Sequence, residues 1–188
     1  FEFHGSTAGV REQAETVEGI AKSLGGESFR WAEKTEERTH LWQARHDALY
    51  AALALKPGAR AWSTDACVPV SRLAECIENT RLDIEKSRAT ATIVGHVGDG
   101  NFHVIFLIDP KYPEEQNIAR QINHRMISRV IAMEGTCSGE HGIGIGKKDY
   151  LDTEFGEALG IMHDIKHTLD PCNIMNPGKV LDSDYCNT

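Results

Sequence analysis

The 188-residue sequence lacks two features that would each point to a class of protein. It has no apolar run near the roughly 20 residues that a membrane-spanning helix needs. It also has no excess of basic residues, because 20 Lys and Arg stand against 28 Asp and Glu and the formal net charge is -8. Nucleic acids and anionic membranes are bound by clustered positive charge, so the composition argues against either partner.

Paired thiols of the C-x-x-C type are absent as well. The chain has five cysteines, an odd number, and no two of them have that spacing. This pattern favours reduced, structural thiols and therefore a compartment inside a cell or organelle. The five are Cys67, Cys76, Cys137, Cys172 and Cys186.

A starting methionine and a targeting sequence are not seen either. Residues 1–5 (FEFHG) look like the middle of a strand rather than a signal or transit peptide. We therefore expect the chain to be a fragment of a longer protein. Its length suits one domain, or one domain with an appendage, of ordinary globular composition.

Hydrophobic periodicity and the positions of Gly and Pro predict an α+β fold. We expect a ferredoxin-like unit, with an antiparallel or mixed sheet and helices on one face, followed by a C-terminal helical segment. The tail at 173–179 has no clear period and is expected to be coil. Strands are expected at 1–4, 28–32, 60–68, 90–97 and 102–108, and helices at 10–24, 35–55, 71–87, 114–133, from 147, and 154–169.

The most informative stretch runs from Gly95 to His103 (GHVGDGNFH). Turn formers lie between two apolar segments, since glycine reaches positive φ without penalty and Asp and Asn bond back to their own backbone. The stretch predicts a β-hairpin in which His96 leaves one strand about where His103 enters the next. Imidazole is a common metal ligand, so two of them side by side would form half of a metal site.

A glycine-flanked loop, 138–142 (SGEHG), offers further ligands. Glu140 supplies a carboxylate, and His141 is either a fourth ligand or a free base. Three protein ligands leave coordination positions open, as in catalytic sites. A divalent ion there could lower the pKa of a substrate hydroxyl, and His141 could accept the proton. The alternative is that both are solvated loop residues.

Other patterns are weaker. His163 and His167 are spaced i, i+4 and could chelate a metal, although a polar helix face is the commoner reason for that spacing. Lys147 follows a glycine, but the sequence around it is not a phosphate-binding P-loop. Arg45 is solvated or binds an anion, for which its planar fork is suited. Asp65 has an explanation as a turn or helix-surface residue.

Three motifs in order resemble the C-terminal region of FAD-linked oxidases of the vanillyl-alcohol oxidase type: 96–103 (HVGDGNFH), 138–144 (SGEHGIG) and 170–179 (DPCNIMNPGK). Segments 45–53 (RHDALYAAL) and 62–69 (WSTDACVP) are similar to the mitochondrial D-lactate dehydrogenases within that family. The resemblance covers essentially the whole chain, and three separate motifs make it specific.

The resemblance implies a division of labour. Residues 1–134 would be the cap, or substrate, domain, and 135–188 the glycine-rich active-site loop, the C-terminal helices and a tail that approaches the flavin. The N-terminal FAD-binding domain would lie outside this chain and hold most of the FAD. A mitochondrial location is implied too, with cytochrome c or another electron carrier as acceptor.

The resemblance also assigns roles to residues. The metal ligands of the family fall on His96, His103 and Glu140, and zinc or manganese would suit them. The catalytic base falls on His141. The remaining roles fall on Arg45 and Asn101, expected to bind the substrate, and on Asn176, expected to touch the flavin.

The reaction implied is oxidation of a D-2-hydroxy acid to the 2-oxo acid, with hydride transfer to FAD. Ser63 stands where related D-2-hydroxyglutarate dehydrogenases carry a Lys for the second carboxylate. The Ser at this position, in place of that Lys, favours a monocarboxylate substrate such as D-lactate over D-2-hydroxyglutarate. Two other classes stay open from the residues alone: a metal-dependent hydrolase, and a non-catalytic α+β module whose histidines are structural.

Overall fold

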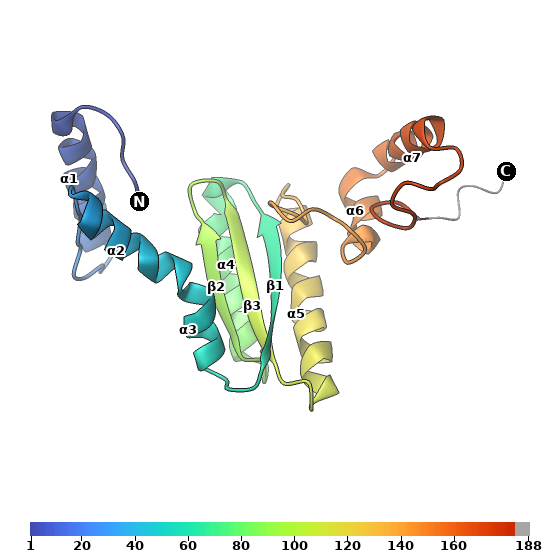
Figure 1. Cartoon of the computed structure of the whole chain (residues 1–188), viewed down its shortest axis with the longest axis horizontal. Helices are drawn as coiled ribbons and strands as arrows, with labels where there is room; N and C mark the ends of the chain where they lie inside the picture. Colours follow the sequence, from blue (N-terminus) through green and yellow to red (C-terminus); the bar gives the residue numbers. More distant parts are fainter. Residues whose placement is uncertain (183–188) are drawn as a thin grey trace. The chain divides into compact units, whose positions relative to one another are not determined.

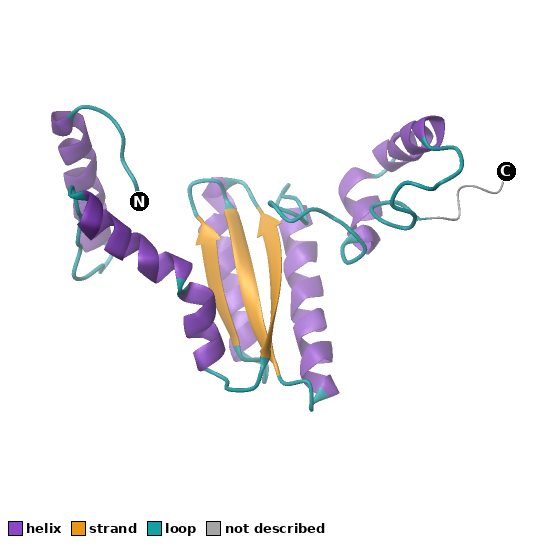
Figure 2. Cartoon of the chain, in the orientation of Figure 1, coloured by secondary structure: helices purple, strands orange, loops and turns teal. Residues whose placement is uncertain are grey.

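The computed structural model describes residues 1–182, so Cys186 and the end of the expected 135–188 segment lie outside the described residues. The chain forms two units, Phe1–Ala48 and a second that begins at Leu49 (Figure 1). The described part of the first unit is helix and loop, whereas the second holds the sheet (Figure 2). No helix within residues 1–182 is long and apolar enough to cross a membrane.

The first unit contains helices α1 (Thr7–Ser23) and α2 (Thr35–His46). Helix α1 begins after Ser6, whose hydroxyl accepts a hydrogen bond of 3.2 Å from the backbone N–H of Gly9 and so caps the helix. The strands predicted at 1–4 and 28–32 are wrong, because neither segment is in a strand. Strands are stabilised by hydrogen bonds to a neighbouring strand, and within residues 1–182 these segments have none.

The long helix predicted over 35–55 is interrupted at Asp47. Helix α2 ends at His46, and a short helix α3 (Ala48–Ala54) follows. The Asp47 carboxylate accepts hydrogen bonds of 3.0 Å from the side-chain amide of Gln43. The backbone N–H of Asp47 still donates to the carbonyl of Gln43 at 2.9 Å, so the last turn of α2 is closed before α3 begins.

The second unit is built on three antiparallel strands in the order β1-β3-β2. They are β1 (Arg60–Cys67), β2 (Ala91–His96) and β3 (Asn101–Ile108). The central strand β3, which is mostly apolar, is buried along nearly its whole length. The predicted α+β class is therefore confirmed, and the sheet is wholly antiparallel rather than mixed in the described part of the chain.

Helices α4 (Val70–Glu85) and α5 (Pro113–Ala132) pack on the sheet and on each other (Figure 1). Alternate residues of β3 form the core with them, since side chains of a strand point to opposite faces in turn. The Trp62 ring of β1 stacks on Phe106 with centroids 5.6 Å apart. Central members of this core are Phe102, Val104 and Phe106 of β3, Leu73 and Cys76 of α4, and Ile122, Met126, Ile127 and Val130 of α5.

The register of the strands fixes which residues share the opposite face. Asp65 of β1 is paired with His103 of β3, and His103 is paired with Val94 of β2. One step towards the hairpin turn, Asn101 is paired with Cys67 on one side and His96 on the other. The polar residues of the three strands therefore gather at one end of the sheet, on the face away from the core.

The C-terminal part contains a short 3-10 helix, η1 (Lys148–Tyr150), and helices α6 (Leu151–Phe155) and α7 (Ala158–Leu169). The single helix predicted over 154–169 is divided at Gly156, whose φ of +51° is a conformation that side-chain-bearing residues rarely adopt. The predicted coil at 173–179 is confirmed. Its start is held by Asp170, whose carboxylate accepts backbone hydrogen bonds from Ile174 and Met175.

Candidate functional site

The hairpin between β2 and β3 brings two histidines together, as the sequence predicts. Its turn is closed by a hydrogen bond of 3.0 Å from the Asp99 backbone N–H to the His96 carbonyl. Gly100 is required there, because its φ is +75° and a Cβ would overlap the carbonyl oxygen of Val68. The rings of His96 and His103 lie with centroids 5.9 Å apart, nearly perpendicular.

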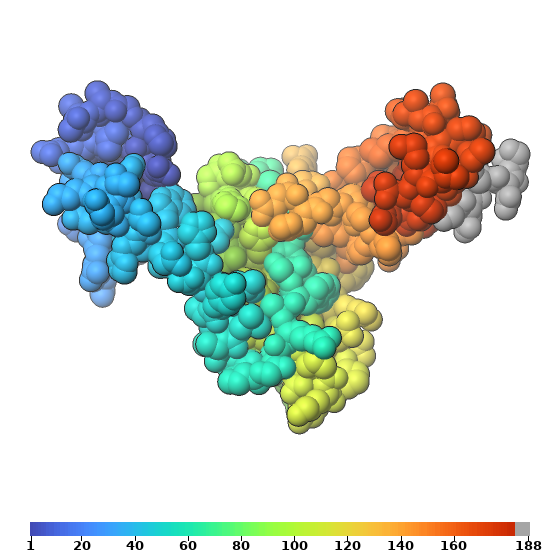
Figure 3. Space-filling view, viewed as in Figure 1, coloured from blue at the N-terminus to red at the C-terminus, as the bar shows by residue number. Residues whose placement is uncertain are grey.

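The glycine-rich loop after α5 supplies the third member of the site. Thr136 forms a β-bridge with Cys67, which fastens the start of the loop to the end of β1. Gly139 lies directly against the side chain of Asn101, where a Cβ would come within 2.5 Å of the Asn101 Cγ. The close approach carries Glu140 over the sheet, and in Figure 3 the orange atoms of the loop lie against the green atoms of the hairpin region.

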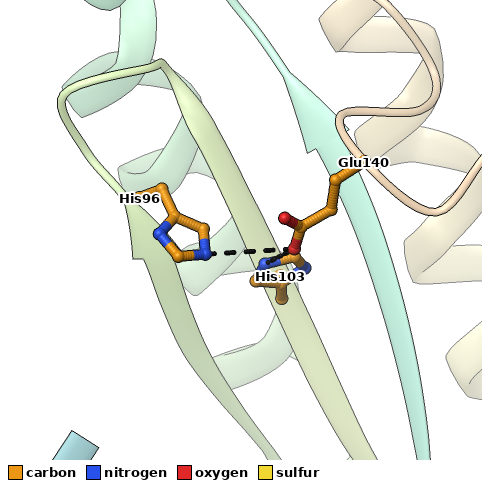
Figure 4. A group of neighbouring side chains, drawn as sticks. All are labelled: His96, His103 and Glu140. Carbon is orange, nitrogen blue, oxygen red and sulfur yellow. Dashed lines mark ion pairs between the residues drawn. The ribbon is translucent and has the colours of Figure 1, made fainter.

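The Glu140 carboxylate lies among three imidazoles. Its Oε1 is 2.9 Å from His103 Nε2, 3.5 Å from His141 Nε2 and 3.9 Å from His96 Nε2. Figure 4 shows the Glu140 side chain extending from the loop beside β1 towards His96 and His103. The sequence-predicted ligands and base are therefore gathered at one place.

The cluster suits a divalent metal ion. One ligand atom from each of His96, His103 and Glu140 lies within 4.8 Å of the others, and within residues 1–182 this is the one group of three such side chains so placed. Two imidazole nitrogens and a carboxylate oxygen are the donor set of catalytic metal sites with open positions. The residues present would thus accept zinc or manganese.

His103 is the buried member of the cluster, with 8% of its side chain exposed, while 46% of His96 and 43% of Glu140 are exposed. Burial lowers the pKa of the His103 imidazole, and the nearby His141 and His96 add to this against the opposing effect of Glu140 and Asp65. A neutral imidazole is the form that binds a metal. The burial of His103 therefore favours its ligand state.

His141 is the most exposed imidazole of the cluster. Its ring lies 5.5 Å from that of His103, and 63% of its side chain is exposed. An exposed imidazole beside a metal-ligand set can serve as a general base. The structure leaves its face open to a small molecule.

Asp65 and Lys147 are the residues of this site that the sequence reasoning missed. Asp65 is neither in a turn nor on a helix surface but in β1, with 2% of its side chain exposed, and it forms an ion pair with Lys147. Burial acts to raise its pKa, but hydrogen bonds from Lys147, Glu140 and His141 outweigh this and lower it to about 2. An Asp inside a strand pattern is the one signal that could have indicated a buried partner.

The other predicted site residues belong to different elements of the chain. Asn101 is buried at the start of β3 beside the cluster, and its Oδ1 has no hydrogen-bond partner among the described residues. Arg45 is exposed on α2, in the first unit. Asn176 is in the tail and accepts a hydrogen bond of 3.2 Å from Lys179. His163 and His167 line a hollow of about 30 Å³ beside the tail, and no metal-ligand group forms there in the described part of the chain.

Comparison with known proteins gives the family. Residues 1–180 match the family model described as FAD linked oxidases, C-terminal domain. The chain is 49% identical over 188 residues to the probable D-lactate dehydrogenase, mitochondrial, of Danio rerio, covering 100% of this chain and 38% of that protein. It is 45% identical over 187 residues to the D-lactate dehydrogenase [cytochrome], mitochondrial, of Arabidopsis thaliana, covering 99% of this chain and 33% of that protein.

A solved structure shows the same fold. The 4-ethylphenol oxidase of Gulosibacter chungangensis, in complex with isoeugenol, aligns with a TM-score of 0.52 at 17% identity over 90% of this chain and 37% of that one. The chain thus spans less than two fifths of each of these three proteins. By its sequence and its fold, the chain belongs to the FAD linked oxidases, as the C-terminal domain of that family.

Proposed function

We propose that this chain is the substrate-side part of a FAD-dependent D-2-hydroxy-acid dehydrogenase that oxidises D-lactate to pyruvate. The observation that carries the proposal is the convergence of His96, His103 and Glu140 with His141 at the open end of the sheet. The names of the relatives from Danio rerio and Arabidopsis thaliana, both D-lactate dehydrogenases, support it.

The residues of the cluster would bind and orient the hydroxy acid. His96, His103 and Glu140 would hold a divalent ion, which when bound supplies a positive charge that stabilises the alkoxide form of a hydroxyl. His141 Nε2 is the atom that accepts the hydroxyl proton, because it is exposed beside the ligand set. FAD, when bound, supplies the acceptor for the two electrons of the C2 hydride.

Other residues would place the ends of the substrate and the flavin. We assign the substrate carboxylate to Arg45, whose guanidinium matches a carboxylate with two parallel hydrogen bonds. Asn101 is assigned to the substrate because its unpaired Oδ1 lies beside the cluster. Asn176 is assigned to the flavin. Ser63 is exposed on the face of the sheet that carries Asp65, and its short side chain fits a substrate with one carboxylate.

The same proposal includes the domain boundaries of the chain and the cellular location of the full-length protein. Residues 1–134 would form the cap over the substrate, and the segment from 135 onward the active-site loop and the tail that approaches the flavin. The flavin domain would lie elsewhere in the full-length protein. The relative named D-lactate dehydrogenase [cytochrome], mitochondrial, supports a mitochondrial enzyme with a cytochrome as electron acceptor.

The test is anaerobic reduction of the flavin in the full-length protein. D-lactate is expected to bleach the flavin absorbance, and L-lactate is expected to leave it unchanged. His141→Ala should slow the bleaching by about 100-fold to 10,000-fold, the usual contribution of a general base. His124→Ala is the matched control, because His124 lies on α5, on the other side of the sheet, and stacks on Tyr150.

Two results would contradict the proposal. A full-length protein without bound flavin would favour a metal-dependent hydrolase, for which the same ligand set is suited. Equal rates in the two histidine variants would remove His141 from the role of base.

A further inference from the structure

We propose that Asp65 is a positioning residue whose buried carboxylate holds the loop bearing Glu140 and His141, so that both side chains are aligned with His103 before any ligand binds. The inference deepens the proposed function, on which it rests for the roles of Glu140 and His141. Asp65 itself lies behind the cluster and is not assigned a contact with substrate.

Asp65 gathers donors from the whole loop onto one carboxylate. Its Oδ2 accepts hydrogen bonds from the backbone N–H of Glu140 at 2.8 Å, from that of His141 at 3.2 Å and from the Ser138 hydroxyl at 3.4 Å. Its Oδ1 accepts one from the ammonium group of Lys147, which also donates to the Asp65 backbone carbonyl at 3.0 Å. The loop is thus hydrogen-bonded to β1 at two places, residues 138–141 and Lys147.

The position of Asp65 in the sheet determines where the loop is held. Asp65 is paired with His103 in the register of β1 and β3, so the anchor and the buried ligand lie on neighbouring strands of one face. With its backbone N–H donated to Asp65, Glu140 extends its side chain from the loop beside β1 towards His103 (Figure 4). The hydrogen bonds to Asp65 thereby hold Glu140 in a fixed position relative to the sheet and to His103.

A carboxylate is required at this position because all its partners are donors. An Asn has one acceptor oxygen and one NH2 group. Whichever way its amide were turned, the NH2 group would face either Lys147 or the N–H groups of Glu140 and His141. Asp65→Asn therefore keeps the size of the side chain and removes the hydrogen bonds at one of its two oxygens.

The alternative is that the ion pair of Asp65 only stabilises the fold and does not position the loop. A second ion pair of the chain serves as a matched control for this alternative. Asp83 of α4 pairs with Arg129 of α5 at 2.6 Å, with 19% and 21% of the side chains exposed. The pair joins the two helices, and in the described part of the chain neither side chain has a hydrogen bond or ion pair with residues 138–147. Asp83→Asn makes the same chemical change and breaks an ion pair without touching the site.

The experiment compares Asp65→Asn and Asp83→Asn in the full-length, metal-stripped flavoprotein. Zinc binding is measured by titration calorimetry with zinc chloride, and amide hydrogen exchange is measured over peptides that contain residues 138–141. Loss of an outer partner of a metal ligand typically weakens metal binding by 10-fold to 100-fold. We expect that loss and faster loop exchange in Asp65→Asn, and wild-type values of both in Asp83→Asn.

Lys147→Met is the second test variant, to be used if the Asp65→Asn protein does not retain its flavin. It leaves the three donors to Oδ2 in place, so zinc binding should weaken by about 3-fold to 10-fold with faster loop exchange, a smaller loss than removal of the whole outer partner.

Wild-type zinc affinity and loop exchange in Asp65→Asn, or in Lys147→Met where that variant is used, would overturn the positioning role. If no D-2-hydroxy acid bleaches the wild-type flavin, the proposed function fails, but the zinc and exchange data still decide on Asp65.

Discussion

Replacing Gly139 by Ala should damage the site through a single steric contact. Gly139 does not have a positive φ, so an Ala can adopt its backbone conformation without strain. The added Cβ, however, would lie 2.5 Å from Asn101 Cγ and 3.0 Å from its Nδ2, whereas ordinary contact begins at 3.4 Å. Asn101 is buried, with 6% exposed, and cannot easily turn away.

The size of the effect on the reaction rate follows from the difference between the 2.5 Å distance and ordinary contact at 3.4 Å. The loop must move outward by about 1 Å, and it carries Glu140 and His141 with it. A misplacement of about 1 Å can cost roughly 100-fold in rate when a reaction depends on aligned groups. We therefore expect flavin reduction by D-lactate to slow by about 100-fold in the full-length protein. The cost to folding stability should be about 1–3 kcal/mol, as for an extra methyl group in a packed place.

Gly146→Ala is the matched control in the same loop. No atom lies within 4 Å of the position where its Cβ would be, and its φ is not positive. The Gly146→Ala variant should reduce its flavin at the wild-type rate. The two rates should still be equal after the metal has been removed from both proteins with EDTA and then restored. Equal rates in Gly139→Ala and Gly146→Ala would refute the reasoning, because the contact with Asn101 would then not determine the position of the loop.

Three further outcomes can be measured. Burial raises the pKa of the Cys137 thiol to about 12, so iodoacetamide at pH 8 should spare Cys137 in the native protein and modify the exposed Cys172, as read by mass spectrometry. Burial acts to raise the pKa of the Asp83 carboxyl, but hydrogen bonds from Arg129 and Arg125 outweigh it and lower that pKa from its ordinary value. The resulting stability is present above the unfolded pKa and is lost as the pH falls through the folded pKa, so thermal melts should separate Asp83→Asn from wild type by about 1 kcal/mol at pH 7 and by progressively less as the pH is lowered. Ser63→Lys should raise kcat/KM for D-2-hydroxyglutarate relative to D-lactate, and an unchanged ratio would count against the assignment of Ser63.

The hairpin and the proximity of its two histidines could be predicted because their signals are local. The Gly-Asp-Gly-Asn turn between two apolar segments specifies a hairpin within ten residues, and the pairing of its strands then fixes His96 and His103 on one face. Glu140 required a longer step, since nothing local places it. Its loop was recognised by the flanking glycines, and in the structure Gly139 lies against the side chain of Asn101.

The anchorage of the loop could not be predicted because it depends on tertiary structure. Asp65 and Lys147 are separated by 82 positions, and neither residue has a local pattern that names the other. The segments at 1–4 and 28–32 failed for a related reason. Their composition suits a strand, but a strand needs a neighbour, and composition does not supply one.

The unequal exposure of the four site residues indicates the side from which a substrate would approach. His103 is buried against the sheet, whereas 63% of the His141 side chain and 46% of the His96 side chain are exposed. The buried member of the cluster therefore lies at its base, and the exposed members lie at its mouth. A hydroxy acid entering from the open side would meet His141 as it reached the ligand set, so the proton acceptor and the hydroxyl would come together without a rearrangement of the sheet. The proposed metal ligand and the proposed proton acceptor are adjacent in sequence, and Asp65 accepts hydrogen bonds from the backbone N–H groups of both, so the two side chains share one anchored segment.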